Sequence, residues 1–127
     1  MSTCFINSFL FKYKINGLVI SYACDLTRDD MAAIKISKVS KEKNEVTKKE
    51  VNPEIVTSIE RIIRDNRANF WTDEPLAESA QKSLIKYSLQ VSCDSGHSIK
   101  CNNEEYGSLP DTFLNFCTDI DVLFTKA

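Results

Sequence analysis

An Asn-Gly pair at positions 16 and 17 constrains the fold more than any other feature of this sequence. It sits at the centre of an alternating apolar stretch, FLFKYKINGLVISYACDL, residues 9–26. Both residues accept the positive φ that the central positions of a type I′ turn require. A two-residue turn pairs Ile15 with Leu18 and Phe9 with Cys24, with apolar side chains on one face. The other face carries Lys12, Lys14, Val19 and Ser21. Because turn chemistry and alternation agree on one register, we predict a β-hairpin.

Two more strands are predicted between this hairpin and residue 52. MAAIKISKV, residues 31–39, alternates so that Ile34 and Ile36 lie on one side. After a polar turn, VTKKEV, residues 46–51, is typical of a short edge strand. Its lysines discourage pairing with the edge of another sheet.

Asn52-Pro53-Glu54 has the features of a helix start. Asparagine can cap the first turn, proline fits the first helical position, and glutamate suits the positive end of the helix dipole. Apolar residues then follow at helical spacing, which predicts a helix that ends near Asn66. They are Ile55, Val56, Ile59, Ile62 and Ile63. We expect the irregular connection after the helix, residues 69–83, to anchor on the core through Phe70 and Trp71.

The stretch YSLQVSCDSGHSIKC, residues 87–101, is predicted to be a second hairpin. A two-residue turn would divide its apolar residues between the two faces. A three-residue turn over residues 94–96, with Gly96 in the left-handed position of a G1 bulge, keeps them together. The facing pairs are then Cys93 with His97, Val91 with Ile99, and Leu89 with Cys101. The polar face carries Ser88, Gln90, Ser92, Ser98, Lys100 and Asn102.

These segments predict one domain, residues 1–127, of the α+β class. The expected order is β-β-β-(β)-α-β-β-α, an antiparallel sheet of two hairpins plus one or two further strands. The last helix begins near Ser108-Leu109-Pro110, and its apolar stripe is Phe113, Phe116, Cys117, Ile120, Leu123 and Phe124. We expect both helices to pack on one face of the sheet and the polar face of each hairpin to meet water.

Composition excludes several classes of protein. The net charge is −2 and the isoelectric point about 5.4, which argues against a nucleic-acid binder. The N-terminus lacks the basic region of a signal peptide, and no apolar run is long enough to span a bilayer. The five cysteines are an odd count at irregular spacing, so we expect reduced thiols and a cytoplasmic protein.

Cys93, His97 and Cys101 form the one cluster that resembles a metal or thiol site. Zinc needs about four ligands, or three and a water, and the sequence contains neither a CxxC motif nor a second histidine. A Cys–His nucleophile also needs an orienting group and an oxyanion hole, which a hairpin tip supplies poorly. We therefore favour core packing for the cysteines and retain a metal or thiol site as a third option. No cofactor is predicted.

The acidic clusters have an ordinary interpretation. Asp25, Asp29 and Asp30 lack the spacing of a calcium loop, and Glu104 and Glu105 lie in a polar loop with no carboxylate placed opposite them. We interpret both groups as solvated loops. The lysines and glutamates of residues 38–54 alternate in sign, and no aromatic residue lies among them to stack on bases.

The segments in this order are an Asn-Gly hairpin, the helix EIVTSIERII, the aromatic NFW, the hairpin YSLQVSCDSGHSIKC and the helix LPDTFLNFCTDI. This order resembles small α+β domains of uncharacterised bacterial proteins. In those, a tryptophan-containing loop follows the first helix, and a YSL…V…DG…I hairpin leads to a final helix that starts with proline. The present chain departs from that pattern at residues 94–97, which read DSGH, and at Asn102 and Asn103 in place of a glycine. The resemblance implies the fold and a bacterial source, and it implies no activity.

The sequence shows no phosphate loop, metal cluster or convergent acid–base set. We therefore interpret the chain as a module, not an enzyme, that binds another protein, as toxin-immunity proteins and phage-encoded inhibitors do. We expect no nucleic acid and no membrane as partner. The expected interface residues are Lys12, Lys14, Trp71, Gln90, Ser92, Lys100, Glu104 and Glu105. The alternative is a small-molecule binder or enzyme with a pocket between sheet and helices.

Overall fold

The computed structural model describes residues 6–15, 17–26, 31–68, 86–93, 98–102 and 112–127. Six strands and two helices lie within them. The strands are β1 (Ile6–Ile15), β2 (Leu18–Leu26), β3 (Ala32–Val39), β4 (Asn44–Val51), β5 (Lys86–Cys93) and β6 (Ser98–Asn102). The helices are α1 (Glu54–Asp65) and α2 (Phe113–Lys126).

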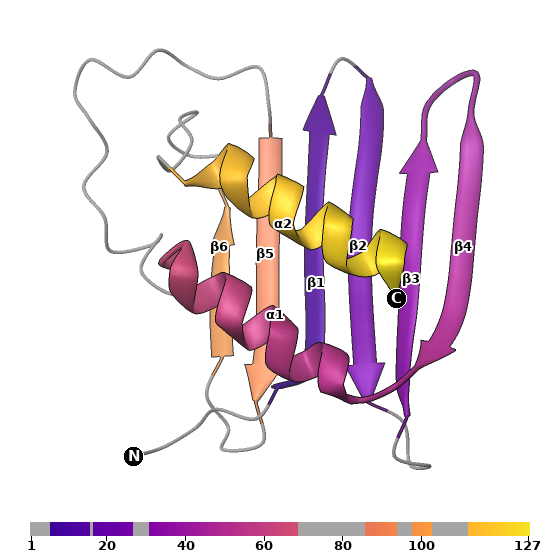
Figure 1. The fold of residues 1–127 in the computed structure, drawn as a ribbon. Coiled ribbons are helices and arrows are strands. Elements are labelled where there is room, and N and C mark those ends of the chain that lie inside the picture. The colour runs from indigo at the N-terminus through magenta and orange to yellow at the C-terminus, as the bar shows by residue number, and fades with distance from the viewer. Residues whose placement is uncertain (1–5, 16, 27–30, 69–85, 94–97, 103–111) are drawn as a thin grey trace, which may run out of the picture.

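All six strands form one antiparallel sheet in the order β4-β3-β2-β1-β5-β6. Both helices lie across the same face of this sheet (Figure 1). The prediction of an α+β fold with two helices on one sheet face is therefore confirmed, and both of the further strands are present.

The hairpin at the start of the chain has the predicted register. Ile15 pairs with Leu18, and Phe9 pairs with Cys24. Gly17 has φ 82°, the left-handed conformation that its position in the turn needs. Asn16 lies outside the described residues.

The second hairpin also has the predicted register. Leu89 pairs with Cys101, and Val91 pairs with Ile99. The turn at residues 94–97 lies outside the described residues, and so does the predicted contact between Cys93 and His97. The connection at residues 69–83, with Phe70 and Trp71, lies outside them too.

The start of α1 follows the predicted chemistry. Asn52 Oδ1 accepts a hydrogen bond from the backbone N–H of Glu54 at 2.9 Å, which satisfies a donor in the first turn. The helix ends at Asp65, one residue before the predicted end. Strand β4 begins at Asn44, two residues earlier than predicted, and lies at the edge of the sheet as expected.

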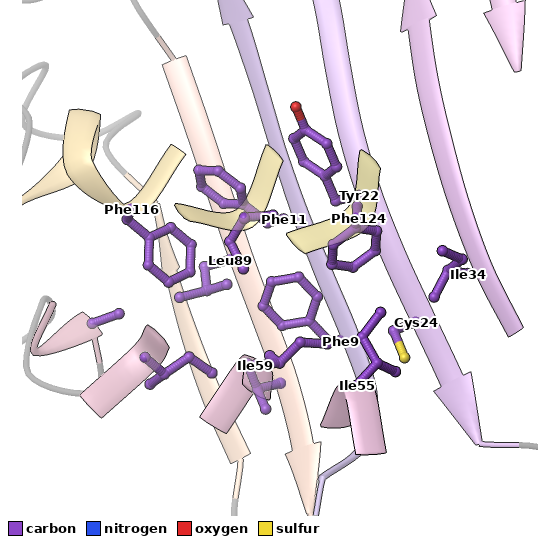
Figure 2. Close-up of a cluster of buried hydrophobic side chains, with 14 of the residues drawn as sticks. Phe9, Phe11, Tyr22, Cys24, Ile34, Ile55, Ile59, Leu89, Phe116 and Phe124 are labelled. Atoms are coloured by element: carbon purple, nitrogen blue, oxygen red, sulfur yellow. The ribbon is translucent and has the colours of Figure 1, made fainter. Parts of the chain in front are cut away.

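The core fills the space between the helices and the sheet (Figure 2). Phe11 of β1 is fully buried, and its ring meets the ring of Phe116 edge-on at a centroid distance of 4.9 Å. The helices contribute Ile55, Val56, Ile59 and Ile63 from α1, and Phe113, Phe116, Ile120 and Phe124 from α2. Burial of these side chains is the main force that holds the two layers together.

One expectation about the cysteines is wrong. Cys93 is disulfide-bonded, whereas Cys24 and Cys117 are free. The number of cysteines and the lack of an export signal do not reveal which thiols a fold brings into contact. The prediction that all five thiols are reduced therefore fails at Cys93.

Neither of the two described helices is long and apolar enough to cross a membrane.

Candidate functional site

The sheet face that points away from the helices, here called the open face, is the candidate site. No described helix or strand packs on it, and none of its described side chains is buried. Its residues are Ser8, Leu10, Lys12, Lys14, Val19, Ser21, Ala23, Asp25, Ala33, Lys35, Ser37, Val39, Asn44, Val46, Lys48, Glu50, Lys86, Ser88, Gln90, Ser92, Ser98 and Lys100. Alternation along β1, β2 and β5 sends most of the apolar side chains of these strands to the side that the helices cover.

The pairing of the strands brings five of the predicted interface residues together on this face. Lys12 and Lys14 lie on β1, Gln90 and Ser92 lie on the neighbouring strand β5, and Lys100 of β6 pairs with Gln90. The other three predicted interface residues, Trp71, Glu104 and Glu105, lie outside the described residues.

Charge on the open face is opposite in sign to that of the whole chain. The face carries six lysines, Lys12, Lys14, Lys35, Lys48, Lys86 and Lys100, against two acidic residues, Asp25 and Glu50. Its formal charge is thus +4. The whole chain is −2, so all residues outside the face together carry −6. The lysines lie on five of the six strands, and they make the face basic in an acidic protein.

Two pairs of lysines stand directly opposite each other on neighbouring strands. Lys35 of β3 pairs with Lys48 of β4, and Lys14 of β1 pairs with Lys86 of β5. Like charges in directly opposed positions of a sheet are destabilising. These pairs therefore lower the stability of the isolated fold, and no contact among the described residues offsets this cost.

Within the described residues, these lysines have no compensating ion pair. The one salt bridge found there joins Lys43 to Glu45 at 3.6 Å, in the exposed β3–β4 connection and the start of β4. Six ammonium groups on one surface, each without a carboxylate partner in the described part of the chain, attract negative charge.

The relief of the face is shallow. Ala23 and Ala33, together with the flanking Lys35, Lys48 and Glu50, line a depression of about 340 Å³ that Asp25 also borders. Three larger apolar side chains are exposed on the same face: Leu10 at 36%, Val39 at 37% and Val46 at 48%. Small, polar and scattered apolar residues make a surface of the kind that protein interfaces use.

A second group of polar residues joins α2 to the sheet. The hydroxyl of Tyr22 donates a hydrogen bond to Asp121 Oδ1 at 2.7 Å. Burial, and then this hydrogen bond, raise the pKa of Tyr22 far above its ordinary value. Burial also raises the pKa of the nearby Cys117 thiol to about 12. Tyr22 is only 1% exposed, so its hydroxyl joins the sheet to α2 and is not open to a substrate.

A third group joins the two helices. Asn66, 1% exposed, donates from Nδ2 to Asp119 Oδ2 at 3.0 Å and to the Ile62 carbonyl at 2.9 Å. Its Oδ1 accepts a hydrogen bond from Asn115 Nδ2 at 2.6 Å, and its carbonyl accepts one from the Thr112 hydroxyl at 2.6 Å. Because the amide is fully satisfied, its role is structural.

The sites predicted from cysteine, histidine and acidic residues are not assembled by the described part of the chain. Cys93 is buried and disulfide-bonded, and no group of three potential metal ligands occurs among the described residues. Asp25 lies on the open face at the end of β2. His97, the side chain of Cys101, Asp29 and Asp30 lie outside the described residues.

A groove of about 700 Å³ runs between α1 and α2, where Ser58, Ile62, Asp119 and Leu123 are among its lining residues. Val51, at the end of β4, also lines this groove. The space between helices and sheet, where the alternative function needs a pocket, is occupied by the aromatic core.

No protein-family model matches the chain, and no curated protein matches it. Of the six lysines of this face, Lys12, Lys14 and Lys100 were among the predicted interface residues, whereas Lys35, Lys48 and Lys86 were not. The sequence did indicate that Lys35 faces away from the core, since it lies between Ile34 and Ile36 in an alternating strand. The pairing of Lys35 with Lys48 depends on the β3–β4 register, and no turn motif in the sequence fixes that register.

Proposed function

We propose that this chain is a non-enzymatic module that binds another protein, in the manner of an inhibitor or immunity protein, through the open face of its sheet. The observation that carries the proposal is the pair of opposed lysines on that face, Lys35 with Lys48 and Lys14 with Lys86. The like charges of such a surface destabilise the free protein, and the negative charges of a bound partner would neutralise them.

The packing supports a binding module over a pocket enzyme. A ligand site between sheet and helices would need a cavity with a few inward polar groups. The rings of Phe9, Phe11 and Phe124 occupy that space in the described structure, and the polar groups nearest to it, such as Tyr22, are already hydrogen-bonded.

The proposal includes a bacterial source and the cytoplasm as the compartment. The resemblance of the segment order to small bacterial domains supports the source. The free thiols of Cys24 and Cys117 fit a reducing compartment, whereas the disulfide at Cys93 is the feature that opposes it. Thiol trapping in intact source cells decides the matter: a reduced Cys93 there supports the cytoplasm, and an oxidised Cys93 contradicts it.

The test is affinity capture with tagged protein from a lysate of the source cells and of any element that infects them, read by mass spectrometry. Ser21→Tyr places a bulky ring in the middle of the open face, where Ser21 pairs with Lys12 and Ser37. Thr57→Tyr adds the same ring on the exposed side of α1 and is the matched control.

We expect one stoichiometric partner that the native protein and Thr57→Tyr capture and that Ser21→Tyr loses. If Ser21→Tyr captures the same partner as well as the control does, the open face is not the binding surface. If no protein is captured above background, the proposal of a protein-binding module fails, and a ligand screen by thermal shift follows.

A further inference from the structure

We infer that the open face is built to bind an acidic surface of another protein. The inference rests on the proposed function and adds the chemistry of the partner. Its starting point is the segregation of charge, since a chain of net charge −2 presents a face of formal charge +4. Complementary charge of this kind steers association and selects partners.

The arrangement of the lysines goes beyond what solubility requires. Lys35 and Lys48 stand opposite each other midway along β3 and the edge strand β4, and Lys14 and Lys86 stand opposite each other where β1 ends and β5 begins. A surface optimised for the isolated fold would place opposite charges in such positions. The two acidic residues of the face, Asp25 and Glu50, instead both flank Ala33 in one row near the start of β3.

The side chains around the lysines favour a protein over a nucleic acid. The middle of the face is made of Ser21, Ala23 and Ser37, and Leu10 and Val46 expose apolar surface beside them. Among the described residues of the face there is no aromatic side chain to stack on bases and no arginine to grip phosphates. The face thus has small and apolar residues with lysines around them. It would complement a protein surface that has apolar residues with carboxylates around them.

The strands provide a matched control for charge. Lys35 and Lys48 point to the open face, whereas Lys38 and Lys49, on the same two strands, point to the opposite face. The double variants Lys35→Glu/Lys48→Glu and Lys38→Glu/Lys49→Glu therefore change the net charge equally and alter opposite faces of the sheet. The control variant also removes the 3.3 Å hydrogen bond from Lys49 to the Ala127 oxygen and places two acids opposite each other at positions 38 and 45. Thermal unfolding establishes that each variant folds.

The experiment titrates poly-L-glutamate, duplex DNA and poly-L-lysine separately into labelled protein at low salt and follows backbone amide resonances. We expect poly-L-glutamate to shift resonances of open-face residues, with an affinity that falls as salt is added. We expect Lys35→Glu/Lys48→Glu to weaken that binding by about tenfold or more, and the control variant to weaken it by less than about twofold.

Four results overturn the inference. They are no binding of poly-L-glutamate, equal weakening by both double variants, tighter binding of duplex DNA than of poly-L-glutamate, and self-association through the open face in sedimentation. The third would assign the face to nucleic acid, and the fourth to a second copy of this chain.

Failure of this inference is distinguishable from failure of the proposed function. In lysate capture, a partner that Ser21→Tyr loses but Lys35→Glu/Lys48→Glu retains would leave the binding module standing and remove the acidic partner. A partner lost by both variants and retained by Lys38→Glu/Lys49→Glu supports the two proposals together.

Discussion

Lys35 and Lys48 lie directly opposite each other on the open face of β3 and β4, and neither forms an ion pair with another described residue. Each has an immediate neighbour in sequence that faces the helix side of the sheet, Ile34 and Lys49. The position of these two ammonium groups therefore follows from the alternation of the strands and from the register that joins them.

Replacing one member of this pair by an acid is expected to stabilise the isolated protein. Lys48→Glu turns a like-charge pair into an opposite-charge pair with Lys35, which should raise the free energy of unfolding by about 0.5 kcal/mol. Lys49→Glu changes the net charge equally but makes no pair with Lys35, so it is the control. It should not stabilise the protein, because it also loses the 3.3 Å hydrogen bond to the Ala127 oxygen. Urea unfolding of both variants checks the expectation, and a Lys48→Glu protein less stable than the native one contradicts it.

Asn66 is expected to be the most sensitive polar residue of the helix layer. Asn66→Ala removes three side-chain hydrogen bonds at a buried position and leaves Asp119 with only the longer 3.4 Å hydrogen bond from the Asn115 amide. We expect a loss of about 2 kcal/mol in the free energy of unfolding. Asn115→Ala, at an exposed position, should cost less than about 1 kcal/mol. Equal losses in denaturant titrations of the two variants would show that Asn66 does not hold the helices together.

Cys24 should make the fold less stable as pH rises above 9. Burial, and then the neighbouring Asp25 carboxylate, raise the pKa of its thiol from 9.0 to about 11. Between these values the unfolded chain releases a proton that the folded chain retains, so the free energy of unfolding falls by at most about 1.4 kcal/mol per pH unit.

The slope against pH isolates this effect from any change in packing. Cys24→Ala should decline less steeply than the native protein between pH 9 and about 11. Ile34→Val, a change at another buried core position that adds no titrating group, should keep the native slope. Parallel curves for the native protein and Cys24→Ala would exclude the contribution of this thiol.

The states of the cysteines can be read by alkylation and mass spectrometry. In the folded protein Cys24 should resist iodoacetamide, because its side chain is 1% exposed. After unfolding without reductant, Cys24 and Cys117 should be alkylated and Cys93 should remain unmodified until a reductant is added. Alkylation of Cys93 in unreduced protein would show that its disulfide does not form.

Much of the fold could be predicted because local chemistry and alternation agreed. The turn at Gly17 fixes the first hairpin by itself, and the hydrophobic pattern selects a single register for the second. Asn52 marks the start of α1 for the same kind of local reason. These features depend on residues that are close in the sequence.

Contacts between distant residues could not be predicted in this way. Asp121 bonds Tyr22 across 99 positions, and Asp119 bonds Asn66 across 53. Both contacts depend on how α2 packs against the sheet and against α1, and helical spacing alone does not specify that packing. The basic character of the open face was hidden for a similar reason, since its lysines come from five strands and only the strand order gathers them.

The measurement that tests the central claim most directly is a lysine footprint of the complex with the captured partner. Free and bound protein are acetylated briefly, and modification of each lysine is read by tandem mass spectrometry. We predict protection of Lys35 and Lys48 on the open face and unchanged modification of Lys38 and Lys49 on the other face of the same strands. Equal modification of Lys35 and Lys48 in the free and bound protein would contradict the account.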